Sequence, residues 1–208
     1  MLKSSSITFT YDGVNKFNFP DIQLQKGENL LVLGESGVGK TTLIQILAGL
    51  LKSDSGKVEF CNTDYNKLST KKMDQFRGKH IGMIFQKPHF VRNLNILDNL
   101  LLSLYLSKNR QDKNLAIQLL KEIGLGNKLK SKPNHLSQGE QQRAAIALSV
   151  IKSPDLILAD EPTSSLDDAN CQKIITLLKD QAKKTASQLI IITHDNRLKS
   201  QFNKSITL

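Results

Sequence analysis

The stretch GESGVGKT, residues 34–41, constrains this chain more than any other part of its sequence. It fits the pattern G-x-x-x-x-G-K-[ST] and lies between LLVLG, which reads as a buried strand, and TTLIQILAGLL, which reads as a helix that ends near Gly49. Glycines in such a loop let successive backbone N–H groups face a phosphate, and the following helix adds the positive end of its dipole. The sequence therefore predicts a phosphate-binding loop between a strand and a helix.

The residue types in and near this loop suit a nucleotide. Lys40 can reach the β and γ phosphates, and the Thr41 hydroxyl can ligate Mg²⁺. Glu35 places an acid in the loop, so its side chain must point outward to avoid repelling phosphate. Upstream, the ring of Tyr11 could stack on a nucleobase, although a core or turn position would suit it equally. The candidate binding residues in the loop are Gly34, Glu35, Ser36, Gly37, Val38, Gly39, Lys40 and Thr41.

Strands and helices alternate along the chain around a helical insertion. SITFTY and DIQLQ favour antiparallel strands with a turn at KGEN, whereas GKVEFCN, HIGMIFQ, DLILAD and QLIIITH read as further strands. Helical spacing of apolar residues marks NILDNLLLSLYL, NLAIQLLKEIGL, QGEQQRAAIALSVI and DANCQKIITLLKDQ. We expect one α/β domain, 1–208, with a mainly parallel sheet and an N-terminal antiparallel part. Residues 1–92 and 152–208 would form its core, and about 93–151 an inserted α-helical part.

Polar residues follow three of the apolar strands, where sites in open α/β sheets lie. After LILA, Asp160 would hold Mg²⁺ and Glu161 would accept a hydrogen bond from an attacking water as general base. An acid pair that caps a helix before Pro162 is the structural alternative. Gln86 could ligate Mg²⁺ and orient water, or cap its strand. His194 follows QLIIIT, and contact with the γ-phosphate is the favoured role over a structural one.

LSQGE, residues 136–140, predicts a helix start that could both cap the helix and bind an anion. Ser137-x-x-Glu140 fits a capping box, in which each residue's side chain bonds the other's backbone. With Gly139 in the first turn, the helix also leaves N–H groups open to an oxyanion. Because residues 34–41 already supply the chain's own phosphate site, a second anion site indicates a ligand shared between two chains.

Composition excludes several classes of protein. The apolar runs fall far short of the roughly 18 residues that a membrane span needs, and MLKSSSITFTY lacks the apolar region of a secretory signal. Cys61 and Cys171 indicate neither a disulfide framework nor zinc-ligand spacing and are expected to be buried small residues. The net charge of +10 suits nucleic acid, an anionic membrane surface or, as we favour, a solvated lysine-rich surface.

Taken in order, these motifs resemble the ATP-binding subunit of ATP-binding-cassette (ABC) transporters, and the resemblance covers essentially the whole chain. It implies that two subunits pair head to tail, with each ATP between the loop of one chain and the LSQGE signature of the other. The residues that match the family's motifs are Tyr11 for base stacking, Gly34 to Thr41 for the Walker A loop with Thr42 following it, Gln86 for the Q-loop, Ser137 and Gly139 for the signature, Asp160 and Glu161 for Walker B, SSLD with Asp167 for the D-loop and His194 for the switch.

Two parts of the chain depart from the family's usual motifs. The common signature is LSGGQ, whereas this chain has Gln138 and Glu140 in place of a glycine and the glutamine. The segments RGKHIGMIFQKPHFVRNLNILDNL and LADEPT are similar to the branch that serves lipoprotein release, macrolide and peptide export, and the cell-division complex. SSLD differs from that branch's usual D-loop.

The resemblance implies an ATPase subunit that uses ATP and Mg²⁺. It would dimerise, pair with a separate integral membrane permease, and lie in the cytoplasm on the inner face of the cell membrane, with no nucleic-acid partner. The alternative is a soluble ABC-type ATPase that acts on nucleic acid or ribosomes, which only the charge supports. A kinase or GTPase would leave LSQGE unexplained, and no NKxD motif is present. The catalytic candidates are Lys40, Gln86, Glu161 and His194, and the metal candidates are Thr41, Gln86 and Asp160.

Overall fold

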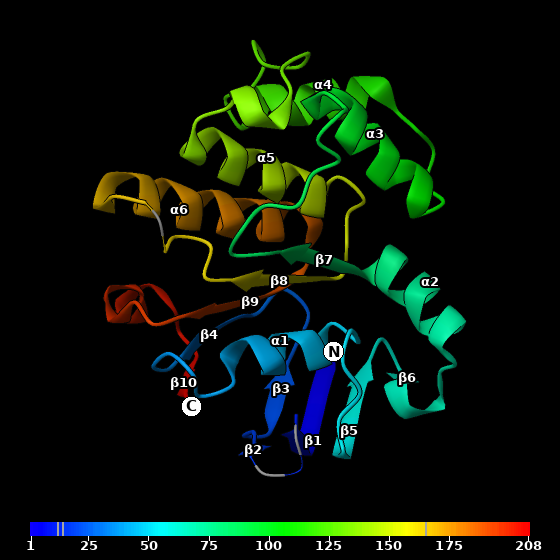
Figure 1. Ribbon diagram of the computed structural model, residues 1–208, viewed down its shortest axis with the longest axis vertical. Helices are drawn as coiled ribbons and strands as arrows, with labels where there is room; N and C mark the ends of the chain where they lie inside the picture. Colours follow the sequence, from blue (N-terminus) through cyan, green and yellow to red (C-terminus); the bar gives the residue numbers. More distant parts are fainter. Residues whose placement is uncertain (12, 14, 165) are drawn as a thin grey trace.

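A computed structural model describes residues 1–11, 13, 15–164 and 166–208, and it contains two β-sheets and a helical layer (Figure 1). One sheet is parallel throughout, in the order β10-β4-β9-β8-β7. Helices or the second sheet cover both of its faces, which explains why its central strands are almost wholly apolar. Its strands are β4 (Asn29–Leu33), β7 (Ile81–Ile84), β8 (Leu156–Asp160), β9 (Gln188–Thr193) and β10 (Ser205–Thr207).

The second sheet is antiparallel and is built mainly on the N-terminal strand β1 (Leu2–Thr10). This strand pairs with β2 (Lys16–Asn18), β3 (Ile22–Leu24) and β5 (Ser55–Phe60), and β5 continues to β6 (Thr63–Asp64). The predicted turn at KGEN leads from β3 into β4, so the chain passes from one sheet directly to the other.

Helix α1 (Lys40–Leu47) lies between the two sheets (Figure 1). It buries Leu43, Ile44, Ile46 and Leu47 in a core shared with apolar side chains of both sheets. Each such side chain contributes about 1.5–3 kcal/mol when fully buried, so this core fixes the helix that follows the loop. The helix ends as predicted, because Gly49 has a left-handed backbone, with φ +66°.

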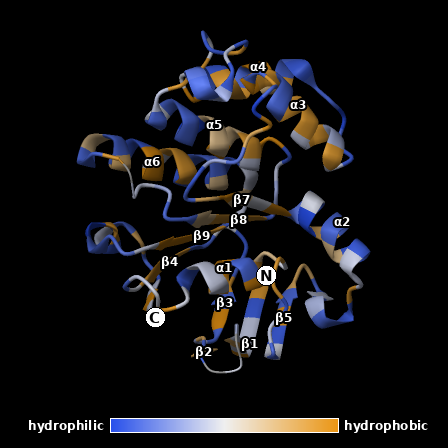
Figure 2. Cartoon of the chain, in the orientation of Figure 1, coloured by the Kyte–Doolittle hydropathy of each residue, from blue (hydrophilic) through white to orange (hydrophobic). Residues whose placement is uncertain are grey.

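Four helices pack beyond the other face of the parallel sheet and complete a second core. Strand residues alternate between the two cores: Leu31 and Leu33 of β4 belong to this second core, whereas Leu30 and Val32 face α1. Figure 2 shows the parallel strands mostly in hydrophobic colours, as expected for strands covered on both sides. The helices are α3 (Ile96–Leu106), α4 (Lys113–Glu122), α5 (Gln138–Val150) and α6 (Asp168–Thr185).

The predicted α/β fold, with a parallel sheet, an antiparallel N-terminal part and a helical part, is confirmed. The sequence did not indicate helix α2 (Thr70–His80), because only Met73 of its side chains is buried and its apolar pattern is weak. Strands β2, β6 and β10 were not predicted either. Three short 3₁₀ helices complete the described chain: η1 (Tyr65–Lys67), η2 (Pro133–His135) and η3 (Asn196–Gln201).

Two predicted strand ends were wrong. The strand expected in HIGMIFQ ends at Ile84, so Gln86 lies two residues beyond it rather than at its end. The strand expected in GKVEFCN ends at Phe60, because Cys61 and Asn62 adopt left-handed backbone angles and turn the chain. Among the described residues, none of the helices combines the length and apolar character that a membrane crossing requires.

Two glycines differ in the space beside them: Gly82 lies where β7 closely approaches α5, whereas Gly78 in α2 lies in open space. We therefore expect an alanine at each position to change the stability in opposite directions. A Cβ added at Gly82 in β7 would lie 2.6 Å from the Ser149 carbonyl oxygen, so Gly82→Ala should lower the free energy of unfolding by about 1–3 kcal/mol. At Gly78 in α2 it would meet nothing within 4 Å, so Gly78→Ala should raise that free energy by about 0.4–1 kcal/mol. Urea unfolding followed by circular dichroism measures both. Equal stability of the two variants would contradict this packing.

Candidate active site

The loop between β4 and α1 is shaped by glycines with left-handed backbone angles. Gly37 and Gly39 have φ values of +89° and +94°, and a Cβ on Gly39 would lie 2.7 Å from the Phe17 ring. No side chain in the described part of the chain caps α1, so its first N–H groups remain open to an anion. The Nζ of Lys40 donates hydrogen bonds of 2.7 Å to the carbonyls of Gly34 and Glu35. The loop therefore gathers N–H donors and one ammonium group.

Glu161 is the most constrained acid beside this loop. Its carboxylate lies 3.7 Å from the Lys40 Nζ, accepts a 3.1 Å hydrogen bond from the Thr193 hydroxyl and lies 2.9 Å from the Nδ1 of His194. Only 9% of Glu161 is exposed. A carboxylate accepts, so His194 donates from Nδ1 in this bond. Its other ring nitrogen takes no part in it.

The backbone of Glu161 is strained in the way that functional residues often are. Its φ is +47°, a left-handed angle that costs a non-glycine residue about 1–3 kcal/mol. The Glu161 N–H donates to the Ile192 carbonyl at 2.9 Å, and this bond to β9 holds the strained residue in place. The arrangement can present a carboxylate to a bound water from a fixed position.

Asp160, the last residue of β8, has the character of a cation ligand. Within the described part of the chain, its buried Oδ1 has no hydrogen-bond partner. Burial raises the pKa of the Asp160 carboxyl, and the nearby Thr41 hydroxyl opposes that rise. Oxygen atoms of a carboxylate and a hydroxyl are ligands that Mg²⁺ accepts, together with several waters. Asp160 and Thr41 therefore fit a magnesium ion.

Most of the predicted site residues line one pocket of about 700 Å³. Gln86 reaches it from beyond β7, and its Nε2 lies 3.5 Å from the Ser164 hydroxyl. Glu35 is exposed at the rim. Gly34 and Val38 are not in the lining and pack against each other inside the loop. The pocket is lined by Tyr11, Phe17, Glu35, Ser36, Gly37, Gly39, Lys40, Thr41, Thr42, Gln86, Glu161 and His194.

The aromatic wall of this pocket has two members, of which the sequence indicated one. Tyr11 is 56% exposed, and its hydroxyl lies 3.0 Å from the Thr42 hydroxyl. Its ring meets those of Phe9 and Phe17 edge-on, and its exposure shows that it is not a core tyrosine. Phe17 was missed, although the alternation in KFNF was a usable signal. Thr193 was missed as well, because nothing in the apolar run QLIIIT shows that its hydroxyl faces Glu161.

The structure does not bring the LSQGE residues to this pocket. Ser137 and Gly139 begin α5, in the helical layer on the opposite side of the parallel sheet from α1 (Figure 1). The predicted capping box is confirmed: Ser137 accepts from the Glu140 N–H at 3.3 Å, and the Glu140 carboxylate accepts from the Ser137 N–H at 2.8 Å. An added Cβ on Gly139 would meet only Arg143, at 3.8 Å. Within SSLD, Ser165 lies outside the described residues.

The chain is similar to proteins of known function over most of its length. It matches the family described as ABC transporter over residues 17–164. It is 34% identical to the lipoprotein-releasing system ATP-binding protein LolD of Wigglesworthia glossinidia brevipalpis, covering 100% of this chain and 93% of the relative. It is 38% identical to the LolD of Buchnera aphidicola subsp. Acyrthosiphon pisum, covering 91% of this chain and 83% of the relative.

Solved structures give the same result. The fold matches a dimeric post-hydrolysis state of the ATP-binding cassette MJ0796 bound to ADP and Pi, with a TM-score of 0.90 and 31% identity over 100% of this chain and 94% of the other. It matches cbiO1 from Clostridium perfringens, part of the ABC transporter complex cbiONQ, with a TM-score of 0.82 and 29% identity over 93% of this chain and 78% of the other.

Thr193 belongs to none of the sequence motifs, but its contact with Glu161 predicts that changing it lowers the rate of ATP hydrolysis. Thr193→Val keeps the shape of the strand but removes the hydrogen bond to the carboxylate. A hydrogen bond to a charged group is worth about 1.5–3 kcal/mol, so the kcat of ATP hydrolysis should fall roughly 10- to 100-fold with little change in KM. Thr207→Val, on the exposed side of β10, is the control. An unchanged kcat in Thr193→Val would show that this bond does not position Glu161.

Proposed function

Because the chain belongs to the ABC transporter family and is an ATP-binding, ATP-hydrolysing subunit of it, we propose that two copies close around two MgATP and drive a separate membrane permease. One observation carries this proposal. The structure separates the two anion-binding features of the chain, because the loop leads into α1 on one side of the parallel sheet and the LSQGE helix start lies in the helical layer on the other side (Figure 1).

The separation is explained if each nucleotide contacts both chains. The loop of one chain supplies Lys40 and its N–H groups, and the second chain supplies Ser137 and Gly139 at the start of α5. The open surface around Gly139 suits this role, since no side chain blocks its approach to a phosphate. In this proposal residues 1–92 and 152–208 hold the nucleotide, and about 93–151 presents the signature to the partner copy.

The pocket residues have the chemistry for phosphoryl transfer to water. Lys40 can turn from the Gly34 and Glu35 carbonyls toward the β and γ phosphates, and Tyr11 with Phe17 lies where an aromatic wall can contact the base. Glu161 takes the proton of the attacking water, since it is fixed by Thr193 and His194. His194 contacts the γ-phosphate through its other nitrogen.

A magnesium ion fits between the loop and β8. Thr41 and Asp160 would hold it, and Gln86, which lines the pocket together with Thr41, would complete the set. When bound, the ion neutralises negative charge on the phosphates as it develops during transfer.

A second surface suits the permease. A groove of about 630 Å³ runs between α2, β7 and α3, and Leu106, Val91 and Leu50 on it are exposed at 68%, 47% and 44%. Grouped exposed apolar residues are typical of protein-binding sites. Phe85 lines this groove and the next residue, Gln86, lines the nucleotide pocket. A docked permease segment would therefore be one residue from the site of hydrolysis.

Lipoproteins are the cargo class that we propose, because relatives that match this chain over most of its length are lipoprotein-releasing subunits. The chain would lie in the cytoplasm against the inner face of the cell membrane, held there by the permease. Those relatives give no support to the alternative of an ATPase that acts on nucleic acid.

Capture of the permease tests the proposal. Tagged Glu161→Gln should retain ATP because it lacks the general base, and it should bring a multi-spanning membrane protein out of detergent-solubilised host membranes. Adding Leu106→Glu should abolish this capture, because it places a charge on the apolar groove. Adding Leu115→Glu is the control, since Leu115 is also exposed but lies on α4 outside the groove. Mass spectrometry identifies the captured proteins. Capture of nucleic acid or ribosomal proteins alone would overturn the transporter assignment.

A further inference from the structure

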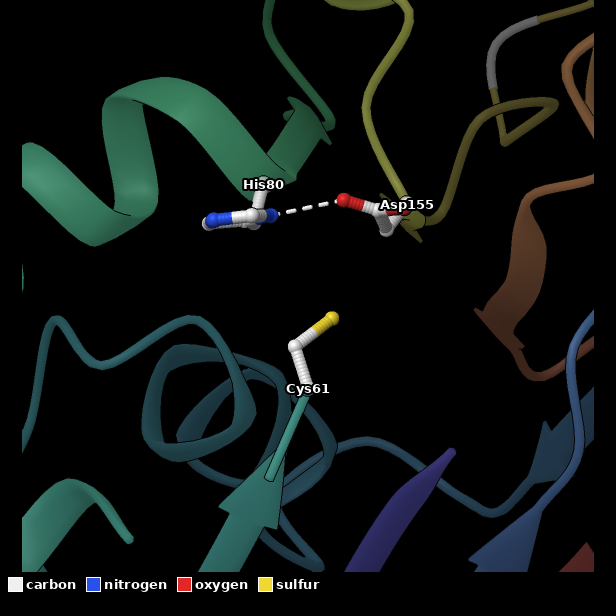
Figure 3. A group of neighbouring side chains, drawn as sticks. All are labelled: Cys61, His80 and Asp155. Carbon is white, nitrogen blue, oxygen red and sulfur yellow. Dashed lines mark hydrogen bonds and ion pairs between the residues drawn. The ribbon is translucent and has the colours of Figure 1, made fainter. Parts of the chain in front are cut away.

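Three side chains with metal-binding chemistry meet at the end of the parallel sheet farthest from the nucleotide pocket. They are Cys61 in the turn after β5, His80 at the end of α2 and Asp155 just before β8 (Figure 3). One ligand atom from each lies within 4.8 Å of the other two. In Figure 3 the Cys61 sulfur points toward the space between the imidazole and the carboxylate. All three residues are half-buried, so the cluster is sheltered and still open to solvent.

Two of the three ligands are already fixed relative to each other. The Nδ1 of His80 lies 2.6 Å from the Asp155 carboxylate, and the Asp155 N–H donates to the His80 carbonyl at 3.0 Å. The Asp155 carbonyl in turn accepts from the Gln188 N–H of β9 at 2.9 Å. Because backbone bonds hold both residues, little conformational entropy would be lost when they bind an ion.

The third ligand occupies a strained position that other residues would fill at lower cost. Phe60 and Thr63 pair across a two-residue hairpin turn, in which Cys61 and Asn62 have φ values of +49° and +58°. Both left-handed angles suit Asn, Asp or Gly, as at Asn62, and disfavour other side chains. The turn therefore gives Cys61 no conformational advantage, and it directs the sulfur at the His80–Asp155 pair.

We propose that Cys61, His80 and Asp155 bind a zinc ion, with water as the fourth ligand. A thiolate, an imidazole nitrogen and a carboxylate oxygen are the three side-chain ligand types that Zn²⁺ uses in proteins. Modest side-chain rotations bring ligand atoms at the observed separations around one ion. Binding releases the Cys61 thiol proton to solvent and shifts the His80 proton from Nδ1 to Nε2.

The same cluster does not suit an activated cysteine. Burial raises the pKa of the Cys61 thiol, and the Asp155 carboxylate raises it further. A nucleophilic cysteine needs its thiolate stabilised by positive charge, which is the opposite environment. A divalent cation between Cys61 and Asp155 would instead compensate both negative charges.

The bound ion would connect three segments of the chain that no nucleotide-site residue connects. It would tie the β5–β6 turn of the antiparallel sheet to the α2–β7 junction and to the start of β8. Asp155 immediately precedes β8 and Asp160 ends it, so the two residues are about 16 Å apart at 3.3 Å per residue. Zinc binding can therefore be measured without disturbing the nucleotide pocket.

Cobalt substitution tests the proposal on the whole chain. The protein is stripped with a chelator, returned to excess Mg²⁺ so that oxygen-ligand sites are filled, and titrated with Co²⁺. We expect one equivalent of Co²⁺ to produce a thiolate-to-cobalt charge-transfer band, which one equivalent of Zn²⁺ removes. Absence of this band in the unmutated protein would overturn the proposal.

Variants assign the band to these residues. Cys61→Asn should abolish it, and Asn suits the left-handed turn, so the thermal stability of the stripped protein should not fall. Asp155→Asn should weaken Co²⁺ binding at least about 10-fold. Cys171→Ala is the matched control, because this buried thiol lies on α6 away from the cluster, and the band should persist in it. A band that survives Cys61→Asn or disappears in Cys171→Ala would place the metal elsewhere.

Discussion

The parallel pairing of β4, β9 and β8 is the constraint on which the site depends. In register, Leu33 of β4 lies beside Thr193 of β9, and Asp160 of β8 lies beside Ile192. All three strands therefore end at the same level, and the phosphate loop, the Asp160–Glu161 pair and His194 follow from adjacent strand ends. A shift of one residue in the β8–β9 register would turn the Asp160 side chain to the other face of the sheet. It would also remove the backbone bond that holds Glu161.

The site contains features that oppose folding and that the surrounding packing offsets. Glu161 has a left-handed backbone, Asp160 has a buried oxygen without a partner among the described residues, and Lys40 is buried beside an acid. These groups lie beside two cores of apolar side chains, which come from both sheets and from the helices around them. A rigid frame with a few strained polar groups at its edge suits a protein that must position charge for a reaction.

The sequence predicted most of this site because glycine spacing and strand-end acids are local signals. The loop, the acid pair and the capping box at Ser137 depend on residues close together in the chain. Thr193 could not be predicted, because its contact with Glu161 depends on which way β9 faces against β8. The cluster of Cys61, His80 and Asp155 could not be predicted from the sequence either. Its members come from three distant segments, and their spacing along the chain matches no metal-ligand pattern. Helix α2 was missed because it buries only Met73, too little for a clear period.

If each ATP is held by two chains, two inactive variants should complement each other in a mixed dimer. Lys40→Ala removes the ammonium group of the loop. Gly139→Asp places a negative charge where the partner's γ-phosphate would bind, and it should fold normally because the position is open and an acid suits a helix start. In a mixed dimer, one nucleotide site combines an intact Lys40 with an intact Gly139. Each variant alone should hydrolyse almost no ATP, and an equimolar mixture should recover hydrolysis. A mixture no more active than its two components would contradict a site shared between chains.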